Sequence, residues 1–530
     1  MWSQPLNPLG IMALSALAAA VPLVVLLVLM GGLRKPGWVS AAWGLATATA
    51  LAVVIWRMPP AYAIWSAVYG VVFAIWPILW IVLAALWLYN LAVDTGRFDL
   101  LRRWMAEHAS GDTRIQAILV AFCFGALLEG MAGFGAPVAV AAFLLVGLGF
   151  SARKAVTVSL IANTAPVAFG SLGIPIVALA GVTGLDQMKL SAMVGRQLPF
   201  LSLILPGYLV WVVAGKKGLK ETWPAALVGG ASFALAQFVV SNFWGPYAAD
   251  IIAALTSIAA LLAFLRFWNP PVSGETAEPS STADAALSTG EVVGAWAPWV
   301  ILAIVMIAWS LFELFHVGQI SIPVTGIHNK IFISLYHQPY AAVYTFQPLA
   351  AGTAAFTATV ITAFFFGASP RVFFNSGLTA LRQLRLPALT VGLIVALAYL
   401  YNYSGMAYTM GAALAALGGA FPLVSGFLGW IACFLSGSDT ASNLLFGNLQ
   451  VAAAHQIGVN PVLLAATNSS GAVTGKMISP QNIAVGVTTV GLAGQEGDVL
   501  RSTFWHSVIL ATFLSLLAFA QAYWLKWMVP

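Results

Sequence analysis

Two acidic residues lie in apolar, glycine-rich stretches of the sequence. Glu129 precedes the stretch Gly-Met-Ala-Gly-Phe-Gly-Ala-Pro, and Asp439 lies within Ser-Gly-Ser-Asp-Thr-Ala-Ser-Asn. An ionised carboxylate deep in a membrane costs at least about 3 kcal/mol, and burial favours the protonated form. Each acid is therefore a candidate proton-coupling residue. In the alternative, the acid caps a helix end and stays ionised. For Asp439, which has hydroxyl neighbours, the capping role is as plausible as the proton-coupling role.

Four short segments interrupt apolar sequence with small and polar residues. They run from Glu129 to Pro137, from Asn163 to Pro166, from Ser436 to Asn443 and from Thr467 to Gly471. Unwound backbone in lipid leaves costly unpaired donors and acceptors, so it survives only against protein or a wet cavity. The free N–H groups of half-helix N-termini attract an anion there. The alternative is tight helix packing, in which Gly, Ala and Ser are common.

The breaks therefore predict a binding site for a small acid, because Ser, Thr and Asn side chains hydrogen-bond carboxylates and hydroxyls. Lys476, just beyond the fourth break, offsets the substrate's charge or pairs with an acid; the alternative is a lysine that extends to the membrane surface. The candidate binding residues are Gly133, Gly135, Asn163, Thr164, Ser438, Thr440, Asn443, Asn468, Ser469, Ser470 and Lys476.

The composition indicates a membrane protein. Of the 530 residues, 61% are hydrophobic and 7% are charged, whereas a soluble domain averages roughly 25% charged residues. Apolar runs of about 20 residues, long enough to cross a bilayer, recur from end to end. The basic residues lie mostly in short loops, which is how membrane proteins set their orientation, and no aromatic-interleaved basic patch predicts nucleic-acid binding. The two cysteines show no disulfide or metal-ligand spacing, and no cofactor or metal is predicted.

The positive-inside rule gives a topology. It predicts about 12 transmembrane helices plus two re-entrant hairpins at 116–150 and 424–455, with both termini outside. Residues 1–222 would form a first repeat with spans 1–5 and the first hairpin. Residues 223–296 would supply two linking spans and a cytoplasmic linker, and residues 297–530 a second repeat with spans 8–12 and the second hairpin.

The repeat is visible in the residues themselves. Leu88-Tyr89-Asn90 recurs as Leu400-Tyr401-Asn402. At a slowly drifting offset, further colinear matches pair Cys123 with Cys433, Glu129 with Asp439, Asn163 with Asn468, Gly170 with Gly475 and Pro175 with Pro480. Because the two Leu-Tyr-Asn spans run in opposite directions in the predicted topology, the copies would be inverted, an architecture of transporters.

Several segments resemble the L-lactate permease family. They are Cys-Phe-Gly-Ala-Leu-Leu-Glu-Gly-Met-Ala-Gly-Phe-Gly-Ala-Pro-Val at 123–138, Asn-Thr-Ala-Pro-Val-Ala-Phe-Gly at 163–170, Val-Gly-Arg-Gln-Leu-Pro-Phe at 194–200, Lys-Glu-Thr-Trp-Pro-Ala at 220–225, the serine-rich stretch at 436–443, and Gly-Lys-Met-Ile-Ser-Pro-Gln at 475–481. The resemblance implies a bacterial inner-membrane permease that imports lactate, and often glycolate, with protons. It also implies an all-α fold with paired hairpins and an elevator-type movement.

The interpretation assigns a role to each candidate. Half-helix N-termini with Asn163, Thr164 and residues 468–470 would hold the carboxylate, and Ser438, Thr440 or Asn443 would bind the 2-hydroxyl. Glu129, with Asp439, would take the proton, and a homodimer is one option for assembly. The rivals are a sodium-coupled carrier of a larger carboxylate, a passive channel and an intramembrane enzyme. The sequence has no HExxH or GxSxG motif for the enzyme.

Overall fold

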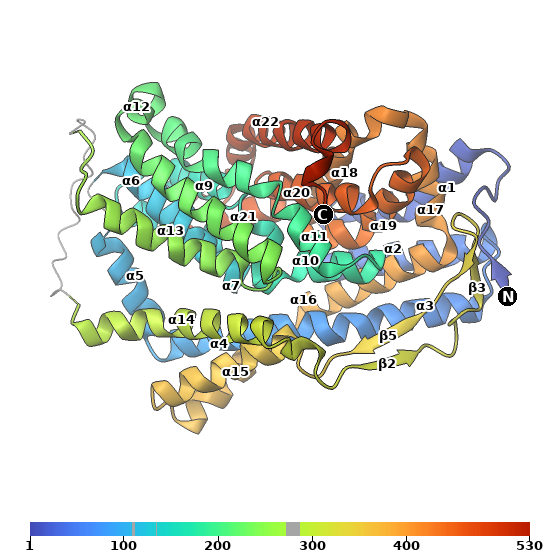
Figure 1. The fold of residues 1–530 in the computed structure, drawn as a ribbon, viewed down its shortest axis with the longest axis horizontal. Coiled ribbons are helices and arrows are strands. Elements are labelled where there is room, and N and C mark those ends of the chain that lie inside the picture. The colour runs from blue at the N-terminus through green and yellow to red at the C-terminus, as the bar shows by residue number, and fades with distance from the viewer. Residues whose placement is uncertain (109–111, 134, 272–286) are drawn as a thin grey trace.

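The computed structural model describes residues 1–108, 112–133, 135–271 and 287–530. The apolar runs of the sequence form helices, and most of the described chain is helical (Figure 1). The helices of the first half are α1 Met12–Leu27, α2 Gly37–Val54, α3 Pro60–Phe73, α4 Trp80–Asp94, α5 Arg97–His108, α6 Thr113–Gln116, α7 Gly125–Met131, α8 Ala136–Gly147, α9 Ala152–Ala162, α10 Gly170–Thr183, α11 Gln187–Val194, α12 Leu198–Phe243 and α13 Ala249–Leu265.

The second half contains fewer but longer helices. They are α14 Thr289–Leu311, α15 Ala351–Phe365, α16 Pro370–Ser404, α17 Met406–Leu414, α18 Phe421–Ser436, α19 Asp439–Ile457, α20 Pro461–Lys476, α21 Pro480–Thr489 and α22 Glu496–Tyr523. Short π or 3-10 turns extend or join several helices: η1 Val28–Gly32, η2 Ala74–Leu79, η3 Ala117–Phe124, η4 Val167–Phe169, η5 Leu314–His316, η6 Ala415–Ala420 and η7 Lys526–Met528.

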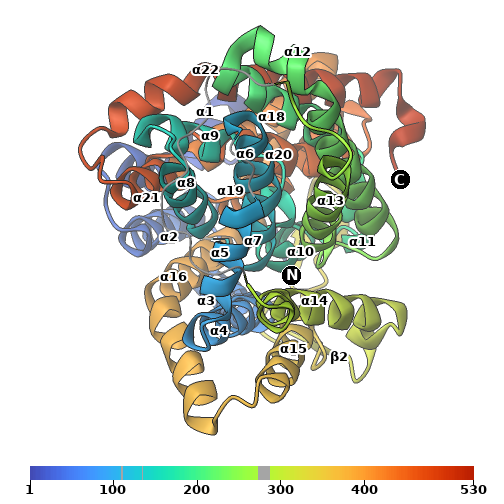
Figure 2. The same cartoon turned by 90° about the vertical axis from the view of Figure 1, so that its left-hand side faces the viewer.

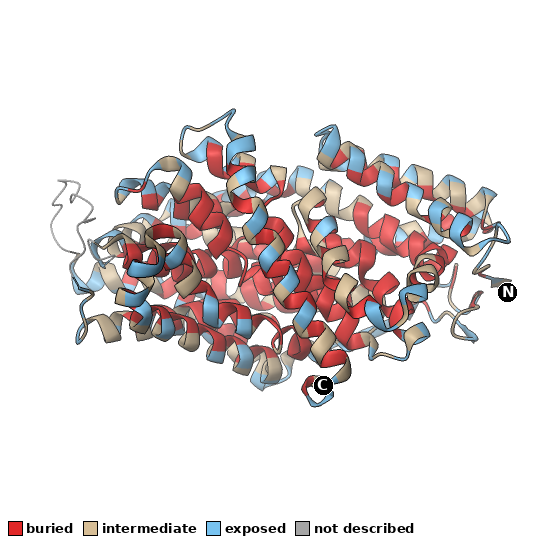
Figure 3. Ribbon diagram, turned by 90° about the horizontal axis from the view of Figure 1, so that it is seen from above, coloured by how far each residue is buried: buried red, intermediate tan, exposed pale blue. Residues whose placement is uncertain are grey.

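Nine helical segments of the described chain are long and apolar enough to cross a membrane, or up to ten if the bent pair Ala152–Ala162 and Val167–Thr183 is one span. Buried residues run through the middle of the molecule, and exposed positions lie on the outer faces of the helices (Figure 3). Many of these exposed side chains are large and apolar, such as Ile64, Phe364 and Trp505. An apolar outer surface suits lipid rather than water, so the fold is that of a multi-pass membrane protein.

The helices form two groups. Figures 1 and 2 both show α3, α4, α14, α15 and α16 along one side, with the breaks of α7–α10 and α18–α21 in the body above them. The two helices that carry Leu-Tyr-Asn run antiparallel within the first group. The end of α4 contacts the early part of α16, where Ser376 donates to Asp94 at 2.6 Å. Gly70, on α3, packs instead against Ala396 near the other end of α16.

Short strands lie at one end of the long axis, beside the N-terminus (Figure 1). The strand β1 Trp2–Ser3 pairs in parallel with β3 Ile331–Ile333, which pairs antiparallel with β4 Gln338–Pro339. The strands β2 Ile320–Pro323 and β5 Val343–Phe346 form an antiparallel hairpin. The all-α prediction missed these strands. β1 lies at the N-terminus and the other four lie between α14 and α15, where β2, β3 and β5 contain the β-branched and aromatic residues that favour strands.

Candidate functional site

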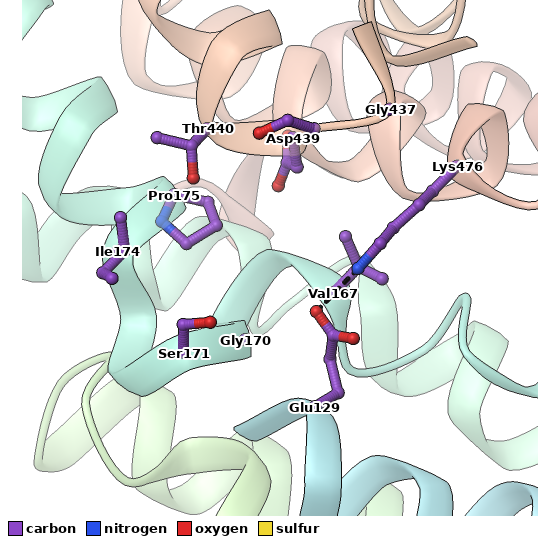
Figure 4. A pocket seen from close by; sticks show the side chains of 11 residues that line it. Glu129, Val167, Gly170, Ser171, Ile174, Pro175, Gly437, Asp439, Thr440 and Lys476 are labelled. Atoms are coloured by element: carbon purple, nitrogen blue, oxygen red, sulfur yellow. Dashed lines mark hydrogen bonds and ion pairs between the residues drawn. The ribbon is translucent and has the colours of Figure 1, made fainter. Parts of the chain in front are cut away.

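A small cavity lies where the interrupted helices meet (Figure 4). Its volume of about 80 Å³ accommodates a molecule of only a few heavy atoms. Four elements converge on it: the end of α7, the start of α10, the junction of α18 and α19, and the end of α20. The lining residues are Glu129, Val167, Gly170, Ser171, Ile174, Pro175, Gly437, Ser438, Asp439, Thr440 and Lys476.

A buried ion pair forms one wall. The ammonium of Lys476 donates to Glu129 Oε1 at 2.7 Å, and Asn163 Nδ2 donates to Glu129 Oε2 at 2.9 Å. Both charged side chains are buried, Glu129 with 3% of its surface exposed. Figure 4 shows the two side chains pointing at one another. The pair joins the first half of the chain to the second, and each charge compensates the other in a medium where a lone charge would be costly.

The start of α19 forms the opposite wall. Gly437 ends α18 in the left-handed conformation, with φ of 70°, and Ser438 then caps α19 by accepting from the backbone N–H of Ala441 at 3.3 Å. Asp439 is buried, and its Oδ2 accepts from the Ser469 hydroxyl at 2.7 Å. Its other carboxylate oxygen has no hydrogen-bond partner within the described chain. The N-terminus of a 19-residue helix thus faces a small cavity, as an anion site requires.

The break between α9 and α10 supplies a third wall. The two helices of this pair are bent by 65°, which confirms the predicted break at 163–166. The backbone then makes a left-handed turn in which Ser171, Leu172 and Gly173 have φ of 47°, 58° and 73°. Left-handed backbone at two residues with side chains costs about 1–3 kcal/mol each and gathers at functional sites. Gly133 lies against the Ser171 hydroxyl, where a Cβ would collide with it.

The predicted break at 467–471 is wrong. The helix α20 runs without interruption from Pro461 to Lys476, and the chain breaks only at residues 477–479, before α21. The small residues serve close packing instead, because Gly471 lies against the backbone of Gly426 on α18. The polar residues of this stretch also find partners that leave the helix intact. Thr467, for example, donates back to the carbonyl of Leu463 at 2.8 Å.

The other predicted binding residues lie around the cavity rather than on its surface. Asn468 donates to Asn443 Oδ1 at 3.0 Å, and Asn443 donates to the carbonyl of Pro175 at 3.1 Å. Ser470 donates to Gln197 Oε1 at 2.7 Å. Thr164 turns back to the carbonyl of Ile161 at 2.6 Å. Except for the local bond of Thr164, these contacts tie α20 to α19 and to Gln197 at the start of α12, and α19 to α10, so they hold the cavity walls in place.

Two of the predicted residues border neighbouring surfaces. Gly133 lines a second, mainly apolar cavity of about 220 Å³ against α4 and α16. Gly135 adopts φ of 84° just before α8, and a Cβ there would lie 3.4 Å from Val485. Sequence reasoning had not singled out Ser171 or Gln197. The only sequence signal for Gln197 was its place in the segment 194–200, which resembles the family. For Ser171 it was its position directly after Gly170, the glycine that matches Gly475 in the repeat.

A larger cavity of about 630 Å³ adjoins the small one. Ser438 and Thr440 line both cavities, and the larger one extends past Thr390 of α16 to Lys35, before α2. Two hydrogen bonds connect α16 to the C-terminal part of α10. Asn402 Nδ2 donates to the carbonyl of Val182 at 2.9 Å, and the Tyr399 hydroxyl donates to that of Gly181 at 3.2 Å.

Interrupted membrane helices that converge on a buried, charged cavity define the class of membrane transporters. The particular family follows from sequence comparison: the chain belongs to the L-lactate permease family, whose model matches residues 15–525. It is 42% identical to the L-lactate permease of Escherichia coli strain K12 over 550 residues, with 100% of both chains covered. The L-lactate permease of Bacillus subtilis strain 168 is 42% identical over 564 residues, again with both chains fully covered.

A relative with a different name is equally similar. The glycolate permease GlcA of Escherichia coli strain K12 is 42% identical over 550 residues, with 98% of both chains covered. Among solved structures, the Alcanivorax borkumensis YdaH transporter matches with a TM-score of 0.43 and 14% identity, covering 83% of this chain and 84% of its own.

Proposed function

We propose that this protein is a secondary active transporter that imports L-lactate, and glycolate or related 2-hydroxy monocarboxylates, with protons across the bacterial inner membrane. The observation that carries the proposal is the Lys476 ammonium, held by Glu129 in a small cavity at the N-terminus of α19. A cation and a helix N-terminus on one small cavity suit a small anion. The names of the relatives, lactate permease and glycolate permease, support this substrate class.

The substrate carboxylate would bind the Lys476 ammonium and the free N–H groups of α19. Ser438 and Thr440 lie on the same wall and Ser171 faces them, so their hydroxyls would bind the 2-hydroxyl. Asn163, by contrast, orients Glu129. The remaining predicted binding residues would act indirectly, through the backbone and the contacts that shape these walls. They are Gly133, Gly135, Thr164, Asn443, Asn468, Ser469 and Ser470.

Proton coupling would follow from competition for Lys476. A bound carboxylate displaces Glu129 from the ammonium, and a buried Glu129 without its cation favours the protonated form. The loaded site then holds one cation, one anion and a neutral Glu129, so its movement through the membrane carries no extra charge. Asp439 shares the cavity and has one carboxylate oxygen without a partner in the described residues, so it is the second candidate for the proton.

We also propose the inverted repeat as the source of the site. Glu129 matches Asp439, and Ser171 matches Lys476 because each follows one of the paired glycines, Gly170 and Gly475. All four lie on one cavity, as expected if two inverted copies meet around it. We retain the predicted twelve spans, two hairpins and periplasmic termini. The two larger cavities lie along part of the boundary at which the body of broken helices would move against α2, α4 and α16.

The test is uptake of labelled lactate into proteoliposomes driven by a pH gradient. Glu129→Gln should abolish accumulation against the lactate gradient, because its amide cannot take up a proton. Glu107→Gln, which alters an exposed acid on α5, is the matched control and should accumulate lactate normally. Full accumulation by Glu129→Gln would overturn the proton assignment. Uptake that depends on sodium at fixed pH would instead favour a sodium-coupled carrier, and competition by a panel of 2-hydroxy acids would rank the substrates.

A further inference from the structure

Asp250 is a third buried acid, besides Glu129 and Asp439, and it lies outside the small cavity. It is 1% exposed, in the first turn of α13. No Lys, Arg or His of the described residues forms an ion pair with it. Its Oδ1 accepts from Gln237 at 3.4 Å, a long hydrogen bond, and its Oδ2 finds no partner among the described residues.

This environment stabilises the neutral acid rather than the carboxylate. The helix N-terminus contributes about 0.3–1 kcal/mol to a negative charge at a surface and up to about 2 kcal/mol when partly buried. Burying a carboxylate with neither a cation nor good hydrogen bonds costs several kcal/mol. The cost exceeds the gain, so Asp250 holds a proton in this arrangement.

The acid contacts one broken element of the first half directly and is linked to the other through Gln237. A Cβ on Gly130 would lie 2.9 Å from the Asp250 Cβ, so Asp250 packs directly against the residue that follows Glu129. Its partner Gln237 also donates to the carbonyl of Ala165, in the break between α9 and α10, at 3.2 Å. Ser202 donates to the Gln237 oxygen at 2.8 Å, which turns the amide N–H groups toward Asp250 and Ala165.

We propose that Asp250 is a proton-binding residue of the transport cycle, coupled to the Glu129–Lys476 pair. Asp250 packs against Gly130, the neighbour of Glu129, and Glu129 is itself paired with Lys476. When Glu129 is paired with Lys476, Asp250 keeps its proton. When substrate takes Lys476, the Asp250 O–H bond breaks as an O–H bond forms at Glu129, and water on the outer side returns a proton to Asp250 before the loaded site moves, so one anion and one proton enter together. The two acids therefore titrate as a pair.

The inference rests on the proposed proton symport, and the experiment separates the two. Asp250→Asn is the matching neutral side chain, which cannot release a proton. Asp250→Ser is smaller and also neutral, and Asp99→Asn changes an exposed acid on α5 as a control. Each purified variant is reconstituted for two assays: exchange of labelled for unlabelled lactate at equal pH, and accumulation driven by a pH gradient.

We expect both Asp250 variants to exchange lactate but to stop accumulating it, with final concentrations equal inside and outside. The control should behave as the original protein does. Accumulation by folded Asp250→Asn or Asp250→Ser would overturn the inference while leaving proton symport intact. Failure of both variants to fold would also overturn it, because Asp250 would then be a structural residue. If the original protein ignores the pH gradient, the proposed function itself fails.

Discussion

The buried pair of Glu129 and Lys476 makes a strong prediction at the scale of the residue. Removing one partner of a buried ion pair costs about 3–5 kcal/mol, because the group left behind must either stay buried as a lone charge or change its protonation to stay buried. Lys476→Gln should therefore lower the midpoint of thermal unfolding in detergent. The double variant with Glu129→Gln should recover most of that loss, since it buries no lone charge.

A surface pair provides the comparison for this prediction. Arg153 and Asp498 also form an ion pair, at 3.0 Å, but both side chains are about half exposed. Such pairs contribute less than about 1 kcal/mol. Arg153→Gln should therefore leave the midpoint nearly unchanged. A Lys476→Gln midpoint as high as that of Arg153→Gln would contradict the energetic role of the buried pair.

The residues of the cavity were predictable to the extent that their chemistry is unusual in an apolar sequence. Glu129, Asp439 and Lys476 are charged groups in such surroundings, and the structure brings all three to one cavity. The partner of Lys476 was not predictable, because the pair joins residues 347 positions apart. Ser171 gave no signal either: a serine among small residues looks the same whether it lines a cavity or packs a helix.

At the scale of the element, glycines set how closely α18 and α20 pack. Gly471 lies against the backbone of Gly426, so a methyl group there has no room unless the helices separate. Gly471→Ala should destabilise the protein by about 1–3 kcal/mol, the usual cost of overpacking, measured as a lower thermal midpoint. Gly497→Ala is the matched control: it lies in α22, and a Cβ added to it would meet nothing within 4 Å.

The control should be neutral or slightly stabilising, because alanine favours helix by up to about 1 kcal/mol over glycine. Equal midpoints for the two alanine variants would show that the helices can separate without cost.

The contact between Gly471 and Gly426 also explains the wrong prediction at 467–471. Small and polar residues mark either a broken helix or a close helix contact, and sequence alone does not distinguish them. At 163–166 the helix is broken, because Pro166 and the left-handed turn that follows interrupt it.

At the scale of the whole molecule, hydropathy predicted a multi-pass helical protein, and this is confirmed. The label α12 covers both apolar runs that flank Gly215, but the backbone leaves the helical conformation at that residue. The two parts pack against each other, since Ser202 donates to Gln237 at 2.8 Å and Gly230 lies against the backbone of Leu203. The structure therefore keeps the two runs as separate helices. The strands between α14 and α15 were missed, since short strands outside a long apolar run leave little hydropathic signal.

The proposed opposite orientation of the two halves yields the last prediction. Glu107 is exposed on α5, which follows the helix that ends after Asn90. Gln338 is exposed on β4, next to Tyr340, whose ring stacks on Tyr403 at 4.1 Å, directly after Asn402. The two positions should therefore face opposite sides of the membrane.

Single cysteines at these two positions allow a direct measurement. The natural cysteines, Cys123 and Cys433, are buried and should contribute little background. A membrane-impermeant maleimide should label Gln338→Cys in intact spheroplasts, and Glu107→Cys only after the membrane is permeabilised. Labelling of both from the same side would contradict the inverted arrangement. It would also remove the reason for pairing Glu129 with Asp439, because that pairing rests on the proposed meeting of two inverted copies.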